Sequence, residues 1–178
     1  VYLQSENGMI GMGPAPETGK EDPYLINAGG GSITAIPGAA SFDSATSFAI
    51  IRGGHVDVSV LGALQVDENG DLANWLIPGK KAPGMGGAMD LVCGAKRVYV
   101  ATSHTDKRGR PKLLKKCSLP LTAVGAVDVV VSEFAVVRRI EGRMTLCELA
   151  PEVTLEQLLE HTDMELELAK TIEPMLGV

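Results

Sequence analysis

The segment GGAMDLVCGAKRVYVAT (residues 86–102) contains the clearest helix-to-strand unit of the chain. Two glycines open residues 86–93, for which we predict a short helix. Residues 97–102 are rich in valine and alternate in polarity, which predicts a strand. A helix that leads directly into an apolar strand is typical of α/β proteins.

Strands and helices alternate on both sides of this unit. We predict a helix over residues 41–52, with Asp43 or Ser44 as its N-cap and a Gly-Gly end, and another over residues 154–161, with a Thr-x-x-Gln capping box. Residues 72–77 are predicted to be extended, and further strands are predicted over residues 1–4, 56–61, 127–131, 134–139 and 144–149. The last two strands form a hairpin around residues 140–143.

Three stretches have weaker patterns. The Gly- and Pro-rich residues 9–19 predict a long loop. Residues 64–66 either pair with the strand at 56–61 or continue it, and the amphipathic tail from residue 163 is predicted to fray. Together the elements predict an α/β fold with an open, mainly parallel sheet and a late antiparallel hairpin, in a single domain over residues 1–178.

The first residues, VYLQ, predict a buried strand that is already under way, and they contain no initiator Met. We therefore expect that the true N-terminus lies upstream, with a further helix and strand that complete the sheet.

Composition excludes several classes of protein. The chain of 178 residues has a net charge of -6, which disfavours a nucleic-acid binder. Its 21 glycines suit an α/β enzyme whose backbone comes close to a ligand. No apolar run approaches the roughly 18 residues of a membrane span, and no signal peptide is visible. Three widely spaced cysteines and three scattered histidines offer no metal-ligand spacing. We expect a cytoplasmic protein with no metal, no membrane partner and no nucleic-acid partner.

Glu6 follows the first predicted strand, in the turn Ser5-Glu6-Asn7-Gly8. In open α/β sheets the carboxyl ends of strands face the ligand crevice, so a carboxylate there is a candidate catalytic group. The alternative is a surface glutamate in an ordinary polar turn.

Three other patterns are chemical candidates. The glycine run at residues 84–90 opens a helix and suits an oxyanion or phosphate, or simply a tight turn. His55 near Asp57 is either a base with its orienting acid or a structural histidine. The basic stretch of residues 107–116 binds phosphates or forms a solvated loop, and it is compatible with an anionic cofactor such as coenzyme A.

Together these motifs resemble the class I coenzyme A transferases of the 3-oxoacid type, and most closely the acetate/acetoacetate β subunits. The matching segments, in order, are SENG (5–8), LINAG (25–29), PGA (37–39), FDS (42–44), IRGGH (51–55), LGA (61–63), GDLANW (70–75), PGK (78–80), GMGGAMDL (84–91) and LPLT (119–122). The resemblance covers roughly residues 1–155. Many succinyl-CoA-using relatives carry a lysine at the position of Gly30, which moves the substrate expectation toward acetate and acetoacetate.

The resemblance implies that Glu6 is the nucleophile of a ping-pong reaction through a glutamyl-CoA thioester. It implies oxyanion or thioester binding at Gly86, Gly87 and Ala88, and substrate binding near Asn7, Asn27 and Gly30. It also implies a separate α subunit as partner, in an α2β2 assembly. For the fold, it implies the type of open α/β sheet that this family shares with sugar-phosphate isomerases. A glutamate needs no general base, because its ordinary pKa of about 4.3 leaves it ionised at neutral pH.

The expected substrates are a short-chain acyl-CoA or 3-oxoacyl-CoA and a free carboxylate, without a resident cofactor. The alternatives are a succinyl-CoA:3-oxoacid or 3-oxoadipate CoA-transferase subunit, an acyl-CoA hydrolase or ring-opening enzyme on the same fold, and a noncatalytic regulatory subunit or CoA-binding module. An isomerase would rest on fold analogy alone.

Overall fold

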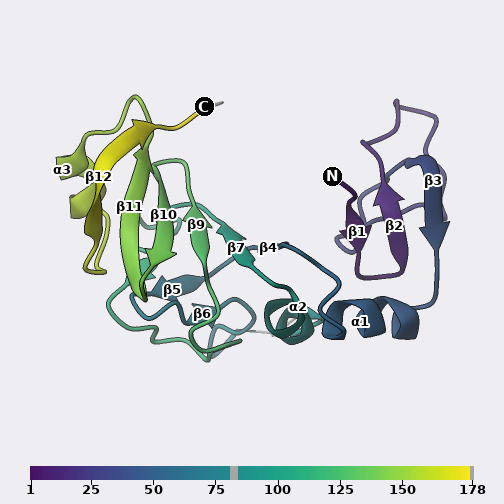
Figure 1. Cartoon of the computed structure of the whole chain (residues 1–178), viewed down its shortest axis with the longest axis horizontal. Coiled ribbons are helices and arrows are strands. Elements are labelled where there is room, and N and C mark those ends of the chain that lie inside the picture. Colours follow the sequence, from purple (N-terminus) through teal and green to yellow (C-terminus); the bar gives the residue numbers. More distant parts are fainter. Residues whose placement is uncertain (81–83, 177–178) are drawn as a thin grey trace. The chain divides into compact units, whose positions relative to one another are not determined.

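The computed structural model describes residues 1–80 and 84–176. The chain divides into two compact units, Val1–His55 and Val56–Val178 (Figure 1). The first unit contains one sheet and the second unit contains two. The single domain expected from the sequence stays a prediction, and the units are described in turn.

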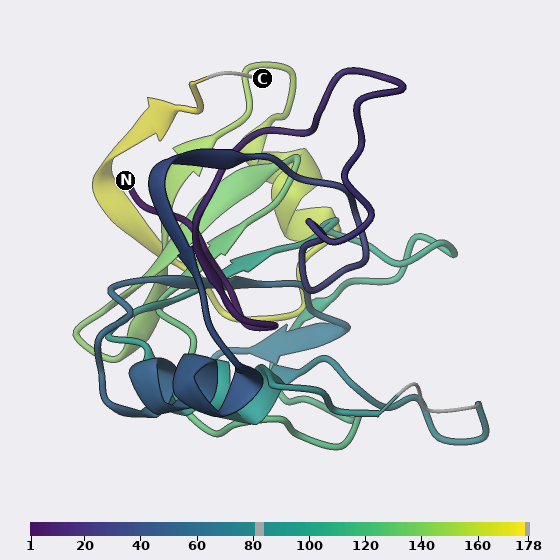
Figure 2. The ribbon, with the colours of Figure 1, turned by 90° about the vertical axis from the view of Figure 1, so that its right-hand side faces the viewer.

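A three-stranded antiparallel sheet and one helix make up the first unit. β1 (Gln4–Ser5), β2 (Met9–Met12) and β3 (Ala35–Ser41) are neighbours in that order. Figure 2 shows β3 running into α1 (Ser44–Arg52). The Thr46 N–H donates to Asp43 Oδ1 at 2.7 Å, so the predicted N-cap of this helix is confirmed.

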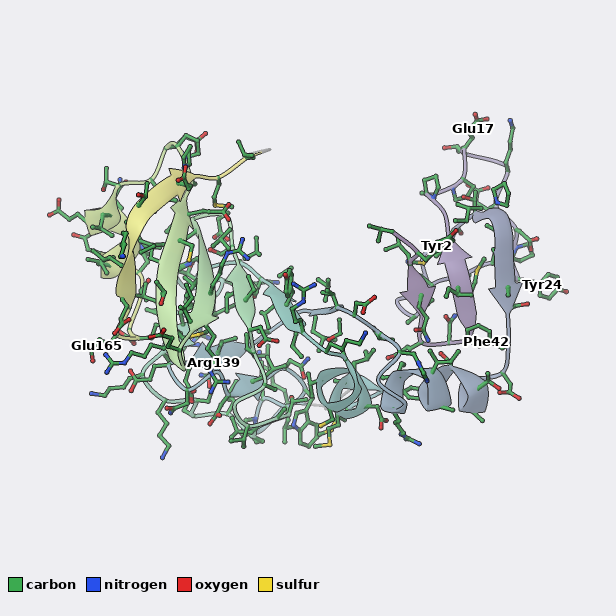
Figure 3. The ribbon with its side chains drawn as sticks, in the orientation of Figure 1. Tyr2, Glu17, Tyr24, Phe42, Arg139 and Glu165 are labelled. Atoms are coloured by element: carbon green, nitrogen blue, oxygen red, sulfur yellow. The ribbon has the colours of Figure 1, made fainter. Side chains whose placement is uncertain are left out.

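The beginning of the first unit differs from the prediction. Val1, Tyr2 and Leu3 are exposed and lie before β1, so a buried strand over residues 1–4 is wrong. Tyr24 is 90% exposed, and Figure 3 shows its ring at the surface of the unit. Apolar residues alone therefore did not identify the buried segments of this unit.

The stretch predicted as a loop contains β2, and β3 was not predicted at all. The register of β2 and β3 shifts between Ile10 and Met12, at a β-bulge. Gly11 has φ +84°, and a Cβ on it would lie 2.8 Å from Ala39 Cα. Gly11 is needed for the backbone conformation of the bulge and for the close approach of β2 and β3. Its presence therefore did not indicate a loop, contrary to the prediction from the sequence.

The second unit is built on a six-stranded mixed sheet. Its order is β12 (Glu167–Pro174), β11 (Arg143–Leu149), β10 (Ala135–Ile140), β9 (Val129–Val131), β7 (Val98–Ala101) and β4 (Ser59–Leu61). Three of the neighbouring pairs are parallel, β4–β7, β7–β9 and β11–β12, while β10 is antiparallel to β9 and β11. The predicted α/β fold, with a mainly parallel sheet and a late hairpin, is confirmed.

Valine and leucine side chains of these strands form the core of the second unit. Among its fully buried members are Val66, Leu72, Val100, Leu113, Val127, Val130, Val137, Leu146 and Leu158. Leu158 comes from α3 (Leu155–Glu160), whose predicted capping box is confirmed: the Thr154 hydroxyl accepts from the Gln157 N–H, and Gln157 Oε1 accepts from the Thr154 N–H.

A second, smaller sheet corrects one prediction. β5 (Gln65–Asp67) pairs antiparallel with β6 (Leu72–Ala73) and parallel with β8 (Leu113–Leu114). Residues 64–66 therefore neither pair with β4 nor continue it. In β8, Leu113 lies opposite Val66 of β5, and local patterns do not reveal a pairing between residues so far apart in sequence.

The tail predicted to fray forms β12 instead. It pairs in parallel with β11, and Ile172 and the preceding Leu166 pack against the core. Glu167, Lys170 and Glu173 make this edge strand polar, which hides its strand character in the sequence. Charged residues are a common feature of edge strands because they oppose aggregation.

His104 lies fully buried shortly after the end of β7 in the second unit. Its Nδ1 is 2.9 Å from the Ser132 hydroxyl, and its Nε2 is 2.8 Å from the Thr162 hydroxyl. The ring also stacks on Phe134 with centroids 5.0 Å apart. Burial lowers the pKa of His104 from 6.5 to about 4, although the Glu133 carboxylate opposes that shift.

We predict that acid destabilises the second unit through His104. The unfolded chain takes up a proton on this histidine below pH 6.5, while the folded chain resists protonation down to about pH 4. Stability is therefore fully present above pH 6.5 and falls toward pH 4, by about 3 kcal/mol. Urea unfolding at pH 7, 6 and 5 measures this slope. His55→Gln, at an exposed histidine, should keep the slope and His104→Asn should flatten it; equal slopes in wild type and His104→Asn would contradict the prediction.

Candidate active site

Glu6 lies in the tight turn between β1 and β2 of the first unit. The Gly8 N–H donates to the Ser5 carbonyl at 3.0 Å and closes the turn. Gly8 has φ +121°, and its carbonyl accepts from the Phe42 N–H at 2.9 Å. A Cβ on Gly8 would lie 2.1 Å from the Phe42 carbonyl oxygen, so only glycine fits at this position.

A second motif packs against this turn. The Asn7 side-chain amide donates to the Ile26 carbonyl at 2.9 Å, and the Ala28 N–H donates to the Ser5 hydroxyl at 2.9 Å. The segments SENG and LINAG, 19 to 23 residues apart in sequence, therefore form one structure. These two hydrogen bonds, made by Ser5 and Asn7 on either side of Glu6, fix the backbone conformation at Glu6.

Asn27 shapes the loop that follows. Its Oδ1 accepts from the N–H groups of Gly29 and Gly31, both at 2.9 Å. Gly30 lies between them at φ +80°, with open space where a side chain would begin. The structure thus brings the predicted site residues Glu6, Asn7, Asn27 and Gly30 into one unit, in the turn and its supporting loop.

The Glu6 carboxylate is partly exposed. Within the described part of the first unit, no hydrogen bond or ion pair occupies its oxygens, whereas its neighbours Ser5 and Asn7 are both engaged. A carboxylate on a fixed backbone with unoccupied lone pairs is suited to attack an electrophile, because little reorganisation is needed.

Two supporting residues were not predicted from the sequence. Gln4 donates from its amide to the Ser47 hydroxyl at 3.1 Å, which ties β1 to the buried face of α1. Ser5 is 4% exposed and accepts the Ala28 bond described above. In the sequence, the position of Gln4 and Ser5 directly before Glu6 was the only indication of a supporting role. Their hydrogen-bond partners, Ser47 and Ala28, are distant in sequence.

The glycine run of the second unit opens α2 (Ala88–Gly94). Gly87 is the N-cap and has no side-chain cap, and Gly86 has φ +57°. The Ala88 N–H makes a long bond of 3.5 Å to the Met85 carbonyl. The N–H groups of Gly86 and Gly87 form no hydrogen bond with any described residue, so they can serve an anion. This part of the predicted site belongs to the second unit and Glu6 to the first.

The His–Asp pair considered as a base does not form. Asp57 accepts from the Lys96 ammonium at 2.7 Å, and this bond lowers the pKa of the Asp57 carboxyl. His55 is exposed, and its backbone N–H donates to the Ile50 carbonyl at the end of α1. His55 therefore lies directly after the end of α1, which agrees with the interpretation of His55 as a structural histidine and not with a catalytic base.

The sequence matches the family model for coenzyme A transferase over residues 1–161. The chain belongs to the coenzyme A transferase family. It is 51% identical over 168 residues to the B subunit of the succinyl-CoA:3-ketoacid coenzyme A transferase of Helicobacter pylori strain 26695, covering 94% of this chain and 81% of that protein. It is 50% identical over 177 residues to the beta subunit of the acetate CoA-transferase of Escherichia coli strain K12, covering 99% and 81%.

Solved structures share the fold. The apoenzyme of an acyl-CoA transferase (YdiF) from Escherichia coli O157:H7 superposes with a TM-score of 0.74 at 22% identity. The match covers 98% of this chain and 35% of that one, so this chain spans about a third of the larger protein. The resemblance inferred from the sequence motifs is confirmed at the level of family and fold.

Cys117 is no rival nucleophile in this family member. Burial, and then the neighbouring Asp67 carboxylate, raise the pKa of its thiol to about 12. Its Sγ donates to the Asp71 carbonyl at 3.7 Å, and its backbone N–H donates to Asp67 Oδ2. A thiol that stays protonated at neutral pH is a poor nucleophile.

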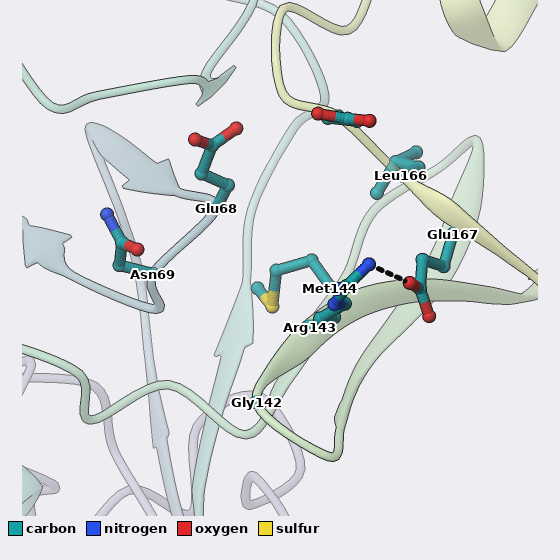
Figure 4. Close-up of a pocket in the computed structure, with 8 residues that line it drawn as sticks. Glu68, Asn69, Gly142, Arg143, Met144, Leu166 and Glu167 are labelled. Atoms are coloured by element: carbon teal, nitrogen blue, oxygen red, sulfur yellow. Dashed lines mark hydrogen bonds and ion pairs between the residues drawn. The ribbon is translucent and has the colours of Figure 1, made fainter.

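A pocket of about 370 Å³ lies elsewhere on the second unit (Figure 4). The β10–β11 turn, the β5–β6 turn and the start of β12 line it, with carboxylates from Glu68, Glu165 and Glu167. Arg143 pairs with Glu167 at 2.5 Å. None of the predicted site residues lines this pocket, and its acidic lining does not suit an anionic substrate.

The described residues contain neither a cluster of metal ligands nor a membrane-spanning helix. In residues 1–80 and 84–176, no three His, Cys, Asp or Glu side chains gather as ligands for a metal ion. Among the helices of the same residues, none is long and apolar enough to cross a membrane.

Proposed function

We propose that this chain is the β subunit of a CoA-transferase that moves CoA from a short-chain acyl-CoA or 3-oxoacyl-CoA to a free carboxylate such as acetate or acetoacetate. The observation that carries the proposal is identity of about one half, over nearly the whole chain, to subunits named for CoA transfer. Both relatives are named as a B or beta subunit, which supports an α subunit as partner. The assembly that we propose for the two subunits is α2β2.

In the proposed mechanism Glu6 is the nucleophile. A carboxylate oxygen of Glu6 attacks the thioester carbonyl and the C–S bond breaks, which releases CoA as a thiolate and forms a mixed anhydride between Glu6 and the acyl group. The thiolate then attacks the glutamyl carbonyl and expels the first carboxylate, which leaves a glutamyl-CoA thioester. The acceptor carboxylate reverses these steps, so one thioester is consumed and one is formed without ATP.

Each attack places negative charge on a carbonyl oxygen. The free N–H groups at Gly86 and Gly87, with Ala88 at the first position of α2, are the proposed donors to that oxygen. One such donor is typically worth about 3–4 kcal/mol in the transition state. Asn7, Asn27 and Gly30 are proposed to bind substrate beside Glu6, chiefly through the backbone of their loop.

The acyl group is proposed to lie near Gly30. The two relatives named for succinyl-CoA and acetate are equally similar to this chain, so identity does not choose between these substrates. A lysine at this position would carry an ammonium group suited to a second carboxylate, and glycine provides none. The proposal therefore favours monocarboxylic acyl groups.

We predict that Gly30→Lys raises the preference for succinyl-CoA over acetoacetyl-CoA by about tenfold in kcat/KM. Space for the side chain is open, although φ +80° costs a non-glycine residue about 1 kcal/mol. Gly30→Gln is the matched control, because it has the same backbone strain without the charge. An equal change of preference in both variants would contradict the prediction.

Exchange of CoA between two carboxylates tests the proposed reaction. The complex with the α subunit, given acetoacetyl-CoA and labelled acetate, should form labelled acetyl-CoA. Release of free CoA at the same rate with and without acetate would indicate a hydrolase and overturn the proposal.

A further inference from the structure

The basic residues after β7 form an ordered hairpin, not a loose loop. In this basic hairpin (residues 104–112), Thr105 and Pro111 form an antiparallel bridge, and the Lys112 N–H donates to the His104 carbonyl at 3.1 Å. At the tip, Asp106 Oδ1 accepts from two backbone N–H groups, at 2.8 and 3.0 Å. Such an Asx-type turn fixes the backbone that carries the charged side chains.

The base of the basic hairpin lies where three parallel strands end. Lys112 donates to the Ala63 carbonyl, which follows β4, and to the hydroxyls of Thr102 and Ser103, which follow β7. The His104 N–H donates to the Glu133 carboxylate, which follows β9. The carboxyl edge of parallel strands is the edge at which α/β sheets bind their ligands.

Positive charge on the basic hairpin is largely uncompensated. Its nine residues carry Lys107, Arg108, Arg110 and Lys112 against the single acid Asp106, whereas the whole chain has a net charge of -6. Asp106 is already paired with Arg110 at 2.6 Å.

The remaining cations have no acid partner among the described residues. Lys107 and Arg108 are exposed at the tip and form no ion pair with any residue that the structure describes. The Lys112 ammonium contacts neutral oxygens, at 2.9, 2.9 and 3.4 Å.

We propose that the basic hairpin binds the phosphate groups of the coenzyme A substrate. This inference rests on the proposed function, which supplies a ligand with several phosphates. Arginine and lysine are the side chains suited to phosphate oxygens, and an ordered turn reduces the entropy lost on binding. Lys107 and Arg108 are the contacting residues, and Lys112 adds positive potential at the base.

Equilibrium binding of CoA tests the inference independently of catalysis. The full complex with its α subunit would be titrated with CoA by calorimetry, for wild type and for the double variant Lys107→Gln/Arg108→Gln. Both side chains are exposed, so the variant should fold normally. We expect affinity to fall at least about tenfold, because two charge-assisted contacts are lost.

The matched control is Lys115→Gln/Lys116→Gln, which removes the same charge from two exposed lysines just beyond β8. It should change affinity less than about twofold, since nonspecific attraction over this distance is weakened by salt. Unchanged affinity in the hairpin variant, or an equal loss in the control, would overturn the inference. Failure of the proposed function would appear separately, as wild-type complex that binds CoA without exchanging it.

Discussion

Replacing Glu6 with glutamine should lower the rate of CoA transfer by at least about 10⁴-fold, because removal of a covalent nucleophile abolishes both halves of the reaction. The glutamine has the same size, and the oxygens it alters have no hydrogen-bond partner within the described part of the first unit. The melting temperature should therefore stay unchanged. Initial rates of exchange and a thermal melt measure the two expectations.

Glu17→Gln provides the control for the Glu6 substitution. Glu17 is an exposed glutamate of the same unit, and its pair with Lys20 is a surface contact that adds little to stability. This variant should keep full activity. A Glu6→Gln enzyme with a rate within tenfold of wild type would show that Glu6 is not the nucleophile.

Gly8→Ala should have the largest effect on stability. The new Cβ would overlap the Phe42 carbonyl oxygen at 2.1 Å, and φ +121° is unfavourable for alanine. The turn must open or β1 and β2 must shift, at a cost of roughly 2–4 kcal/mol. Because the same turn carries Glu6, the rate of transfer should fall as well. Urea unfolding monitors the first effect and exchange kinetics the second.

Gly19→Ala separates the two causes of that loss. Gly19 also has a positive φ, +85°, but a Cβ there meets nothing within 4 Å. It should cost only about 1 kcal/mol, from backbone strain alone. Equal destabilisation by Gly8→Ala and Gly19→Ala would show that contact with Phe42 is unimportant.

Local signals in the sequence were sufficient where the structure depends on neighbouring residues. The Asp43 N-cap, the Thr154 capping box and the strand at β7 were predicted because their hydrogen bonds or periodicity lie within a few residues. The β10–β11 hairpin was predicted for the same reason, and Glu141 at φ 51° precedes Gly142 in its turn.

Elements that depend on distant partners were missed. β2 contains a bulge glycine and was predicted as part of a loop, while the charged residues of β12 led to the prediction of a frayed tail. For β3 no strand was predicted. Likewise, the motif SENG identified Glu6 as a candidate, but only the fold shows that Ala28 and Ile26 hold its turn. Pairing across 19 or more residues depends on tertiary structure, which local propensity does not encode.

Intact mass of the chain, in complex with its α subunit, tests the central claim most directly. Acetoacetyl-CoA would be added without an acceptor, and the modified peptide would be located by fragmentation. The account predicts a CoA-sized adduct on Glu6 that disappears when acetate is added. Steady exchange of CoA with no adduct on Glu6, or with an adduct on another residue, would contradict it.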